Sequence, residues 1–141
     1  MQSIEKMEVY LDRLKKSLAS FPDKRKQLEW LVEYGKTVQV DESLIDEQYR
    51  VEGCISGVYI EGEVKDGKLH FQGTSSSMIV KGYVAILIRA MNDLPRADLE
   101  RGLALISDFA KETGLNTSVV PSRQNAIANI LVHMQNIILS S

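Results

Sequence analysis

The sequence predicts an α+β fold, in which a small antiparallel β-sheet of about three strands packs against several α-helices. Two observations lead to this class. One segment alternates apolar and polar residues on both sides of Asp66-Gly67, whereas most other segments repeat their apolar residues every three or four positions. A chain of 141 residues can bury one core without disulfides or metals, so we expect residues 1–141 to form a single domain.

Two helices are expected at the start of the chain. The first ends before Phe21-Pro22 and has its apolar face at Met7, Leu11, Leu14 and Leu18. The second follows Asp23, and Gly35 is expected to cap its C-terminus. Its apolar face consists of Leu28, Leu31 and Val32.

An acidic linker follows the second helix. Its carboxylates lack the glycine and the regular oxygen spacing of a calcium-binding EF-hand loop, so we interpret the linker as a solvated loop. They are Asp41, Glu42, Asp46 and Glu47. Residues 49–51 are then expected to form a short strand or an extended segment.

A β-hairpin is the clearest local feature. Alternation from Val58 to Lys65 predicts a strand with one apolar and one solvated face, and its inward positions are Val58, Ile60, Gly62 and Val64. Asp66-Gly67 suits the positive φ angles of a two-residue turn. Leu69 and Phe71 continue the inward face on the return strand.

The next helix is apolar around most of its circumference, which predicts a buried central helix. The polar run at 74–77 should cap its start, and Met91 ends its apolar pattern. Gly82 should allow close packing of the helix against the sheet. The aliphatic stem of Lys81 should let its charge reach water.

Two further helices complete the predicted fold. Pro95 opens a short turn that leads into a helix ending at Gly114. A closing helix begins at Pro121-Ser122-Arg123 and has an apolar face from Ala126 to Ile138. Four methionines lie on apolar faces and are interpreted as core residues: Met7, Met78, Met91 and Met134.

The overall composition excludes several classes of partner. The 17 basic and 19 acidic residues give a formal net charge of -2, which argues against nucleic-acid binding. We find no secretion signal, and the longest apolar stretch is far shorter than the ~20 residues of a membrane-spanning helix. Together with a single unpaired cysteine, these features predict a protein of the reducing cytoplasm that does not act at a membrane.

Cys54 is the only cysteine, and it lies between Gly53 and Gly57 directly before the hairpin. Alone it cannot form an intramolecular disulfide, nor supply the ligands of a structural zinc ion or a stable iron–sulfur cluster, so no metal site is expected. It is then either an inert buried thiol or a displayed thiol with its own chemistry. The flanking glycines permit positive φ and close approach of another chain, which favours the second interpretation.

Histidines offer a weaker alternative. A cysteine–histidine nucleophilic pair would need His70 or His133 within hydrogen-bonding distance of Cys54. His70 falls on the outward side of the return strand, and His133 lies on a helix with apolar neighbours. Both are therefore interpreted as surface or structural residues.

Three sequence blocks, taken together, resemble the SufE/CsdE family of sulfur-acceptor proteins. They are Gly53-Cys54 with Ser56 and Val58, then Gly73 and Ser75 followed by Ile79-Val80-Lys81-Gly82, and finally Pro121-Ser122-Arg123. The blocks occur in the family's order, and the similarity extends from about residue 28 to the end. Three positions differ from the usual family pattern: Ile55, Tyr59 and Ser76.

This resemblance implies a function in iron–sulfur cluster assembly. A protein of this family accepts sulfur from a cysteine desulfurase of the SufS/CsdA type, stimulates that enzyme, and carries the sulfur as a persulfide to the scaffold. Pyridoxal phosphate would then belong to the desulfurase, and this chain would need no cofactor of its own. The implied fold is a short antiparallel sheet packed with helices, related to that of IscU scaffolds.

The resemblance makes Cys54 the expected persulfide carrier, with Arg123 as the candidate cation that favours its thiolate. The alternative for Arg123 is a surface ion pair near the start of a helix. Because an exposed persulfide would react before delivery, we expect Cys54 to be partly covered by a loop that swings outward on the glycines at 53 and 57. An alternative is an interaction module that activates a partner enzyme by docking without carrying sulfur. Monomer and dimer both remain open.

Overall fold

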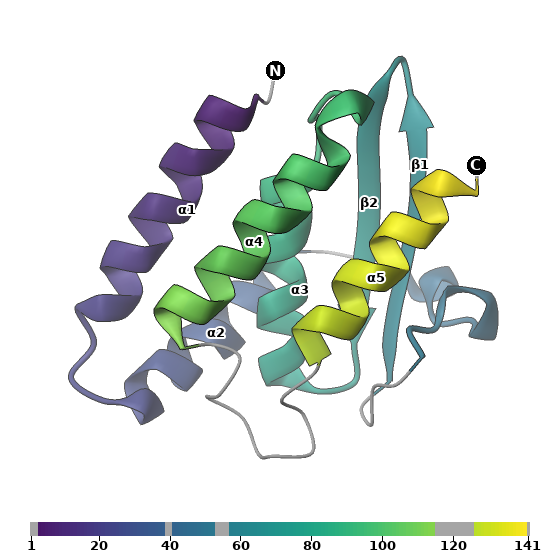
Figure 1. The fold of residues 1–141 in the computed structure, drawn as a ribbon. Helices are drawn as coiled ribbons and strands as arrows, with labels where there is room; N and C mark the ends of the chain where they lie inside the picture. The colour runs from purple at the N-terminus through teal and green to yellow at the C-terminus, as the bar shows by residue number, and fades with distance from the viewer. Residues whose placement is uncertain (1–2, 39–40, 53–56, 115–125, 141) are drawn as a thin grey trace.

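A computed structural model describes residues 3–38, 41–52, 57–114 and 126–140. The predicted α+β class is confirmed, because the described residues form helices and an antiparallel hairpin (Figure 1). The elements are α1 (Ile4–Ala19), α2 (Lys24–Lys36), the 3₁₀ turns η1 (Glu42–Leu44) and η2 (Glu47–Tyr49), β1 (Val58–Lys65), β2 (Lys68–Ser75), α3 (Met78–Met91), the 3₁₀ turn η3 (Arg96–Asp98), α4 (Leu99–Thr113) and α5 (Ala126–Leu139).

The first two helices begin and pack largely as the sequence predicts. Ser3 caps α1 by accepting a hydrogen bond from the Lys6 N–H, and Asp23 caps α2 by accepting one from the Lys26 N–H. The predicted apolar face of α1 is buried: Met7, Leu11, Leu14 and Leu18. On α2, Leu31 is fully buried, while Leu28 and Val32 are half-buried.

Two glycines pack differently from the prediction. Gly35 does not cap α2, because the helix continues to Lys36 and ends at Thr37, whose hydroxyl donates to the Tyr34 carbonyl. Instead, a Cβ added to Gly35 would lie 2.9 Å from the Gly82 nitrogen, and one added to Gly82 would lie 2.3 Å from the Leu31 carbonyl oxygen. Both glycines therefore let α2 approach α3, so Gly82 serves helix–helix packing and not helix–sheet packing.

The hairpin has the predicted turn and faces. Val58 pairs with Ser75 and Lys65 with Lys68 across a two-residue turn. Asp66 and Gly67 take φ values of 54° and 75°, which match the right-handed twist of the two strands. The inward residues Val58, Ile60, Leu69 and Phe71 are buried.

A third strand does not form within the described residues. Arg50 makes only an isolated bridge to Tyr59, and the sheet consists of β1 and β2. The chain before Arg50 is a 3₁₀ turn whose start is capped by Asp46, so few residues remain to pair with β1. On the other edge of the sheet, the Asn92 side chain accepts from the Phe71 N–H at 2.7 Å and donates to its carbonyl at 3.1 Å.

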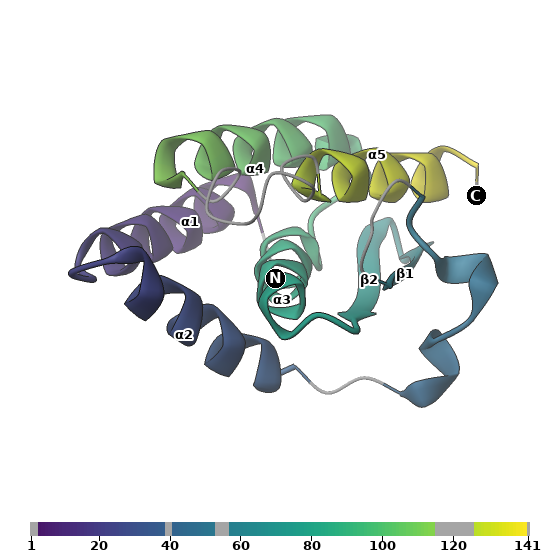
Figure 2. The same ribbon diagram turned by 90° about the horizontal axis from the view of Figure 1, so that it is seen from below.

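Helix α3 occupies the centre of the molecule, as predicted. It contacts α2, β2, α4 and α1, and Figure 2 shows it between the α1–α2 pair and the hairpin. Ser77 caps its start, with the hydroxyl accepting from the Val80 N–H.

The interpretation of Met78 as a core residue is wrong: it precedes the buried stretch of the helix and is 51% exposed. Met7, Met91 and Met134 are fully buried, as predicted.

The last two helices cover the remaining side of the core. α4 ends at Gly114, which has a φ of 73° and forms the predicted left-handed cap. α5 lies against β1 and α4 and buries Ile127, Ile130, Leu131, Met134 and Ile138. The predicted start of this helix at 121–123 lies outside the described residues. Among the described helices, none combines the length and apolar character needed to cross a lipid bilayer.

Candidate functional site

Both predicted site residues, Cys54 and Arg123, lie outside the described residues, as does the predicted loop movement. What the structure describes is the frame on both sides of the cysteine. Val51 and Glu52 precede the Cys54 segment and Gly57 follows it, so these residues fix the positions of its two neighbours in the chain.

A backbone hydrogen bond links the residues on either side of the Cys54 segment. The Val51 N–H donates to the Val58 carbonyl at 2.8 Å, and both residues are about 1% exposed. Buried apolar side chains on both partners exclude water from this hydrogen bond, which makes it costly to break. The segment therefore starts and finishes at one fixed point, the beginning of β1.

Ser76 holds the C-terminal side of the segment. The Gly57 N–H donates to the Ser76 hydroxyl at 3.1 Å, and the Ser76 N–H donates to the Gly57 carbonyl at 2.9 Å. A Cβ on Gly57 would lie 3.2 Å from the Tyr59 ring, so a side chain there would be crowded by Tyr59. The sequence places Ser76 in the polar run that caps the helix and at a departure from the family pattern, and neither observation indicates the Gly57 contact.

The contact with Ser76 brings the N-terminus of α3 to the start of β1. The first turn of α3 contains no acidic residue, so its free N–H groups and helix dipole present partial positive charge there. An anion that forms close to Gly57 would be stabilised by this charge. A thiolate is such an anion.

Tyr49 lies beside the same strand. Partial burial and the nearby Glu61 carboxylate, which also accepts a hydrogen bond from the phenol, raise the pKa of Tyr49. Like an ordinary tyrosine, the phenol is protonated at neutral pH and can donate a hydrogen bond.

His133 occupies a structural position and His70 a surface position, in line with the expectation. The Nε2 atom of His133 lies 3.1 Å from the Ile60 carbonyl oxygen, so this ring attaches α5 to β1. His70 pairs with Glu63 across the strands near the turn of the hairpin, which is the end far from Val58, and its Nδ1 lies 3.8 Å from Asp93. Within the described ranges, no three histidine, cysteine or acidic side chains are grouped closely enough to bind a metal ion.

Comparison with solved structures supports the fold. A protein of Thermus thermophilus, solved in solution, superposes with a TM-score of 0.70 at 20% identity, covering 94% of this chain and 97% of that one. At this identity the likeness concerns the arrangement of helices and strands alone.

Sequence comparison shows the family. A SufE-like protein of Synechocystis sp. is 40% identical over 80% of this chain and 70% of its own length. The chloroplastic/mitochondrial SufE-like protein 1 of Arabidopsis thaliana is 29% identical over 96% of this chain, which spans only 36% of that longer protein. The chloroplastic quinolinate synthase of the same plant is 30% identical over 95% of this chain and 19% of its own length.

The family model of the SufE Fe-S metabolism associated domain matches residues 12–138 of this chain. This range includes Cys54, the hairpin, helices α2, α3 and α4, and all of α5 except its last residue. This chain therefore belongs to the SufE family of proteins of iron–sulfur metabolism.

Proposed function

We propose that this protein is a sulfur acceptor and carrier in iron–sulfur cluster assembly, with Cys54 as the acceptor. The observation that carries the proposal is the position of the only cysteine in a chain of the SufE family. Cys54 lies in a short segment whose ends are fixed by the Val51–Val58 hydrogen bond and by Ser76. A lone thiol in a short segment with anchored flanks suits the exchange of one sulfur atom between proteins.

The transfer is a thiol exchange. The Cys54 thiolate attacks the outer sulfur of a persulfide on the donor protein, a new sulfur–sulfur bond forms on Cys54, and the donor cysteine leaves as a thiolate. One sulfur–sulfur bond replaces another, so the step needs no external oxidant or reductant. A second exchange of the same kind passes the sulfur to the acceptor.

The thiolate is the reactive form, and an ordinary thiol with a pKa near ~8.5 is mostly protonated at neutral pH. The N-terminus of α3, which Ser76 brings beside Gly57, supports formation of the anion. We propose Arg123 as a second source of positive charge, because a guanidinium keeps its charge in almost any surroundings.

The proposed donor is a cysteine desulfurase of the SufS/CsdA type, which holds the pyridoxal phosphate, and the proposed recipient is an iron–sulfur scaffold complex. In this assignment the protein itself needs no cofactor and stimulates the desulfurase by removing its persulfide sulfur. We propose further that residues 1–141 act as one SufE-like domain in a reducing compartment such as the cytoplasm.

Mass spectrometry of the intact protein tests the proposal. After incubation with a cysteine desulfurase and cysteine, we expect the chain to gain the mass of one or more sulfur atoms, which a reducing agent removes. Cys54→Ser should gain none and should lose the stimulation of cysteine turnover.

The opposite pattern would assign a different role. If Cys54→Ser stimulates the desulfurase as well as the parent protein does, the chain activates its partner by docking and the thiol is incidental. Circular dichroism of the variant establishes that it is folded before either result is interpreted.

A further inference from the structure

The outer edge of β1 is the side of the strand that faces away from β2. Lys65 pairs with Lys68 next to the two-residue turn, so the backbone N–H and C=O groups of Lys65 face β2. In an antiparallel pair these groups alternate in direction along the strand. Every second residue before Lys65 therefore also faces β2, and the residues between them point to the outer edge: Val58, Ile60, Gly62 and Val64.

The first half of this edge is already covered. The Val58 carbonyl accepts the Val51 N–H at 2.8 Å, and the Ile60 carbonyl oxygen lies 3.1 Å from Nε2 of His133 on α5. Residues 50–51 thus occupy the place of a third strand for two positions. The residues before them form the 3₁₀ turn η2 instead of continuing along β1.

The second half of the edge, at Gly62 and Val64, is open. No described residue bonds to the outward N–H and C=O groups of these two residues. The opposite edge of the hairpin differs, because Asn92 and Leu94 bond to the backbone of β2 there. Unpaired backbone groups along a strand are a template for pairing with another extended chain. This part of β1 can therefore accept a further strand.

Helix α5 extends over the open part of the edge. It packs on the inner face of β1, where a Cβ on Gly62 would lie 3.3 Å from the Ile137 side chain. Both views show the C-terminal end of α5 beyond β1, on the side away from β2 (Figures 1 and 2). Val64 and Ile137 are only half-buried, so apolar side chains that face inward from an added strand would complete their cover.

The solvent face of β1 is acidic at the same place. Glu61 and Glu63 lie there and line a hollow of about 300 Å³, whose other side chains include His70, Gln72 and Asn92. Glu63 is exposed and makes no ion pair with a described residue, whereas Glu61 accepts a hydrogen bond from Tyr49. The lysines of the hairpin, Lys65 and Lys68, lie next to the turn. Side chains that point to solvent from an added strand are therefore favoured when they are basic.

We propose that the open edge at Gly62 and Val64 pairs with an extended segment of a partner protein in which basic and apolar residues alternate. The basic side chains lie on the solvent face beside Glu61 and Glu63, and the apolar side chains lie beneath α5. Backbone hydrogen bonds supply affinity, and the alternating side chains supply selectivity. The proposal does not depend on sulfur transfer by Cys54.

Nuclear magnetic resonance of the isotope-labelled full chain tests the pairing with a synthetic peptide, acetyl-Thr-Val-Lys-Val-Lys-Val-Thr-amide. In the free protein the amides of Glu61 and Glu63 should be protected by β2, while those of Gly62 and Val64 exchange quickly. When about nine-tenths of the protein is bound, exchange at Gly62 and Val64 should slow about tenfold, because only the free fraction exchanges.

Two altered peptides separate backbone pairing from attraction by charge. Methylation of the valine nitrogens, which face β1 in the proposed pairing, keeps both lysines but blocks the ladder, so exchange should stay unchanged. A peptide with glutamate in place of each lysine keeps the ladder but reverses the charge. It should bind about tenfold more weakly than the lysine peptide.

Matched variants locate the interaction on the protein. Glu63→Gln should weaken binding of the lysine peptide by about threefold, the effect of one exposed ion pair. Glu100→Gln removes the same charge from an exposed position of α4 and should leave the affinity unchanged. Val64→Pro removes an outward N–H without breaking a bond to β2 and should weaken binding further. Because Val64 is half-buried, the signals of the hairpin must show that this variant is folded, and Glu63→Gln carries the test if it is not.

Four outcomes would overturn the proposal. The first is unchanged exchange at Gly62 and Val64 with a large excess of the lysine peptide. The second is equal binding of the methylated peptide, which would show attraction by charge alone. The third is equal binding of the glutamate peptide. The fourth is protection of these two amides that rises with protein concentration in the absence of peptide, which would identify a second copy of this chain as the occupant.

Discussion

Gly57 and Ser76 form the most informative residue pair next to the cysteine. Their two hydrogen bonds, at 3.1 and 2.9 Å, link the start of β1 to the turn between β2 and α3. Only one of these bonds uses a side chain, the Ser76 hydroxyl, and it accepts the Gly57 N–H. This bond can therefore be removed without disturbing the strand pairing.

Replacing Ser76 with alanine should loosen this link. The Gly57 N–H would lose its acceptor while the backbone N–H at position 76 would still donate, so we expect hydrogen exchange at Gly57 to accelerate about fivefold, the effect of one modest hydrogen bond. Ser76→Thr keeps the hydroxyl and should exchange like the parent. Equal exchange rates in Ser76→Ala and the parent would mean that the hydroxyl does not hold this end of the Cys54 segment.

A second residue cluster joins the first three helices. The Tyr10 and Tyr34 hydroxyls hydrogen-bond to each other, Trp30 stacks on Tyr34 with ring centroids 4.7 Å apart, and the Arg89 guanidinium lies 4.8 Å from the centre of the Tyr34 ring. Burial and the hydrogen bond with Tyr34 raise the pKa of Tyr10. The folded protein thus keeps the Tyr10 proton at pH values where the unfolded chain loses it.

This difference predicts a loss of stability in alkali. The stabilising effect is complete below the ordinary tyrosine pKa of 10.0, and the free energy of unfolding should fall as the pH rises above it, because the unfolded state releases the proton first. Urea titrations at pH values around and above 10.0 should show a smaller loss of unfolding free energy for Tyr10→Phe than for the parent protein. The variant should also lose about 1 kcal/mol at neutral pH with the hydrogen bond. An unchanged alkaline slope would contradict the assignment to Tyr10.

At the scale of elements, the contact of α2 with α3 depends on the absence of two side chains. A Cβ on Gly82 would meet the Leu31 carbonyl oxygen, and one on Gly35 would meet the backbone of α3. Backbone atoms cannot move aside as flexible side chains do. The two helices would therefore have to separate to accept an alanine.

Gly82→Ala should thus destabilise the protein by about 3 kcal/mol through overpacking. Gly67→Ala is a useful comparison, because a Cβ there meets no atom within 4 Å and only the positive φ is unfavourable, at a cost of about 1 kcal/mol. Chemical denaturation measures both losses, and near-ultraviolet circular dichroism of the Trp30–Tyr34 stack reports the packing of α2. Similar losses in the two variants would refute the close-contact explanation.

At the scale of the whole molecule, the described core is apolar apart from the hydroxyl of the buried Tyr83. No charged side chain is among its buried residues, and the ion pairs lie between exposed groups. Surface ion pairs contribute little, whereas each buried apolar side chain contributes through burial and packing. We therefore expect stability to depend on the core and only slightly on charge.

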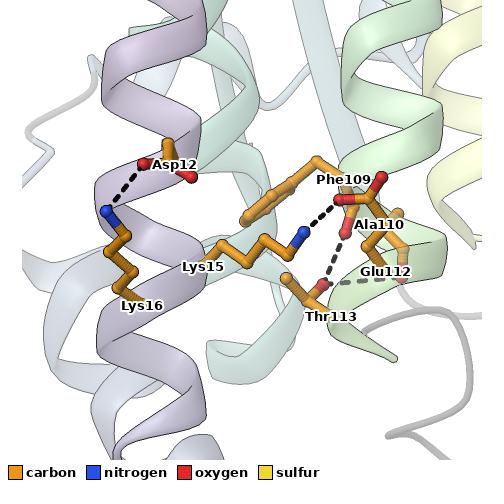
Figure 3. A network of polar contacts seen from close by, with 7 residues as sticks. All are labelled: Asp12, Lys15, Lys16, Phe109, Ala110, Glu112 and Thr113. Atoms are coloured by element: carbon orange, nitrogen blue, oxygen red, sulfur yellow. Dashed lines mark hydrogen bonds and ion pairs between the residues drawn. The ribbon is translucent and has the colours of Figure 1, made fainter.

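A pair of variants tests whether stability depends more on the apolar core than on the ion pairs. Met134 on α5 is fully buried, and Met134→Ala should lower the free energy of unfolding by about 3 kcal/mol because it leaves a cavity. Lys15→Gln breaks the 2.6 Å ion pair that joins Lys15 on α1 to Glu112 on α4 (Figure 3) and should change stability much less. Guanidinium and urea denaturation should rank the two variants in the same order. A larger loss for Lys15→Gln would show that the α1–α4 ion pairs contribute more than exposed charges usually do.

The sequence by itself determined the features that depend on near neighbours. The Asp66-Gly67 turn, the caps at Asp23 and Ser77 and the buried face of α1 all follow from residues a few positions apart, and Cys54 stood out as a lone thiol. Contacts between distant residues were decided by the tertiary structure. Ser76 reaches Gly57 across 19 positions and Asn92 reaches Phe71 across 21, while Gly35 and Gly82 meet between two helices. Periodicity indicates which face of a helix or strand is buried, but only tertiary packing determines which other element that face contacts.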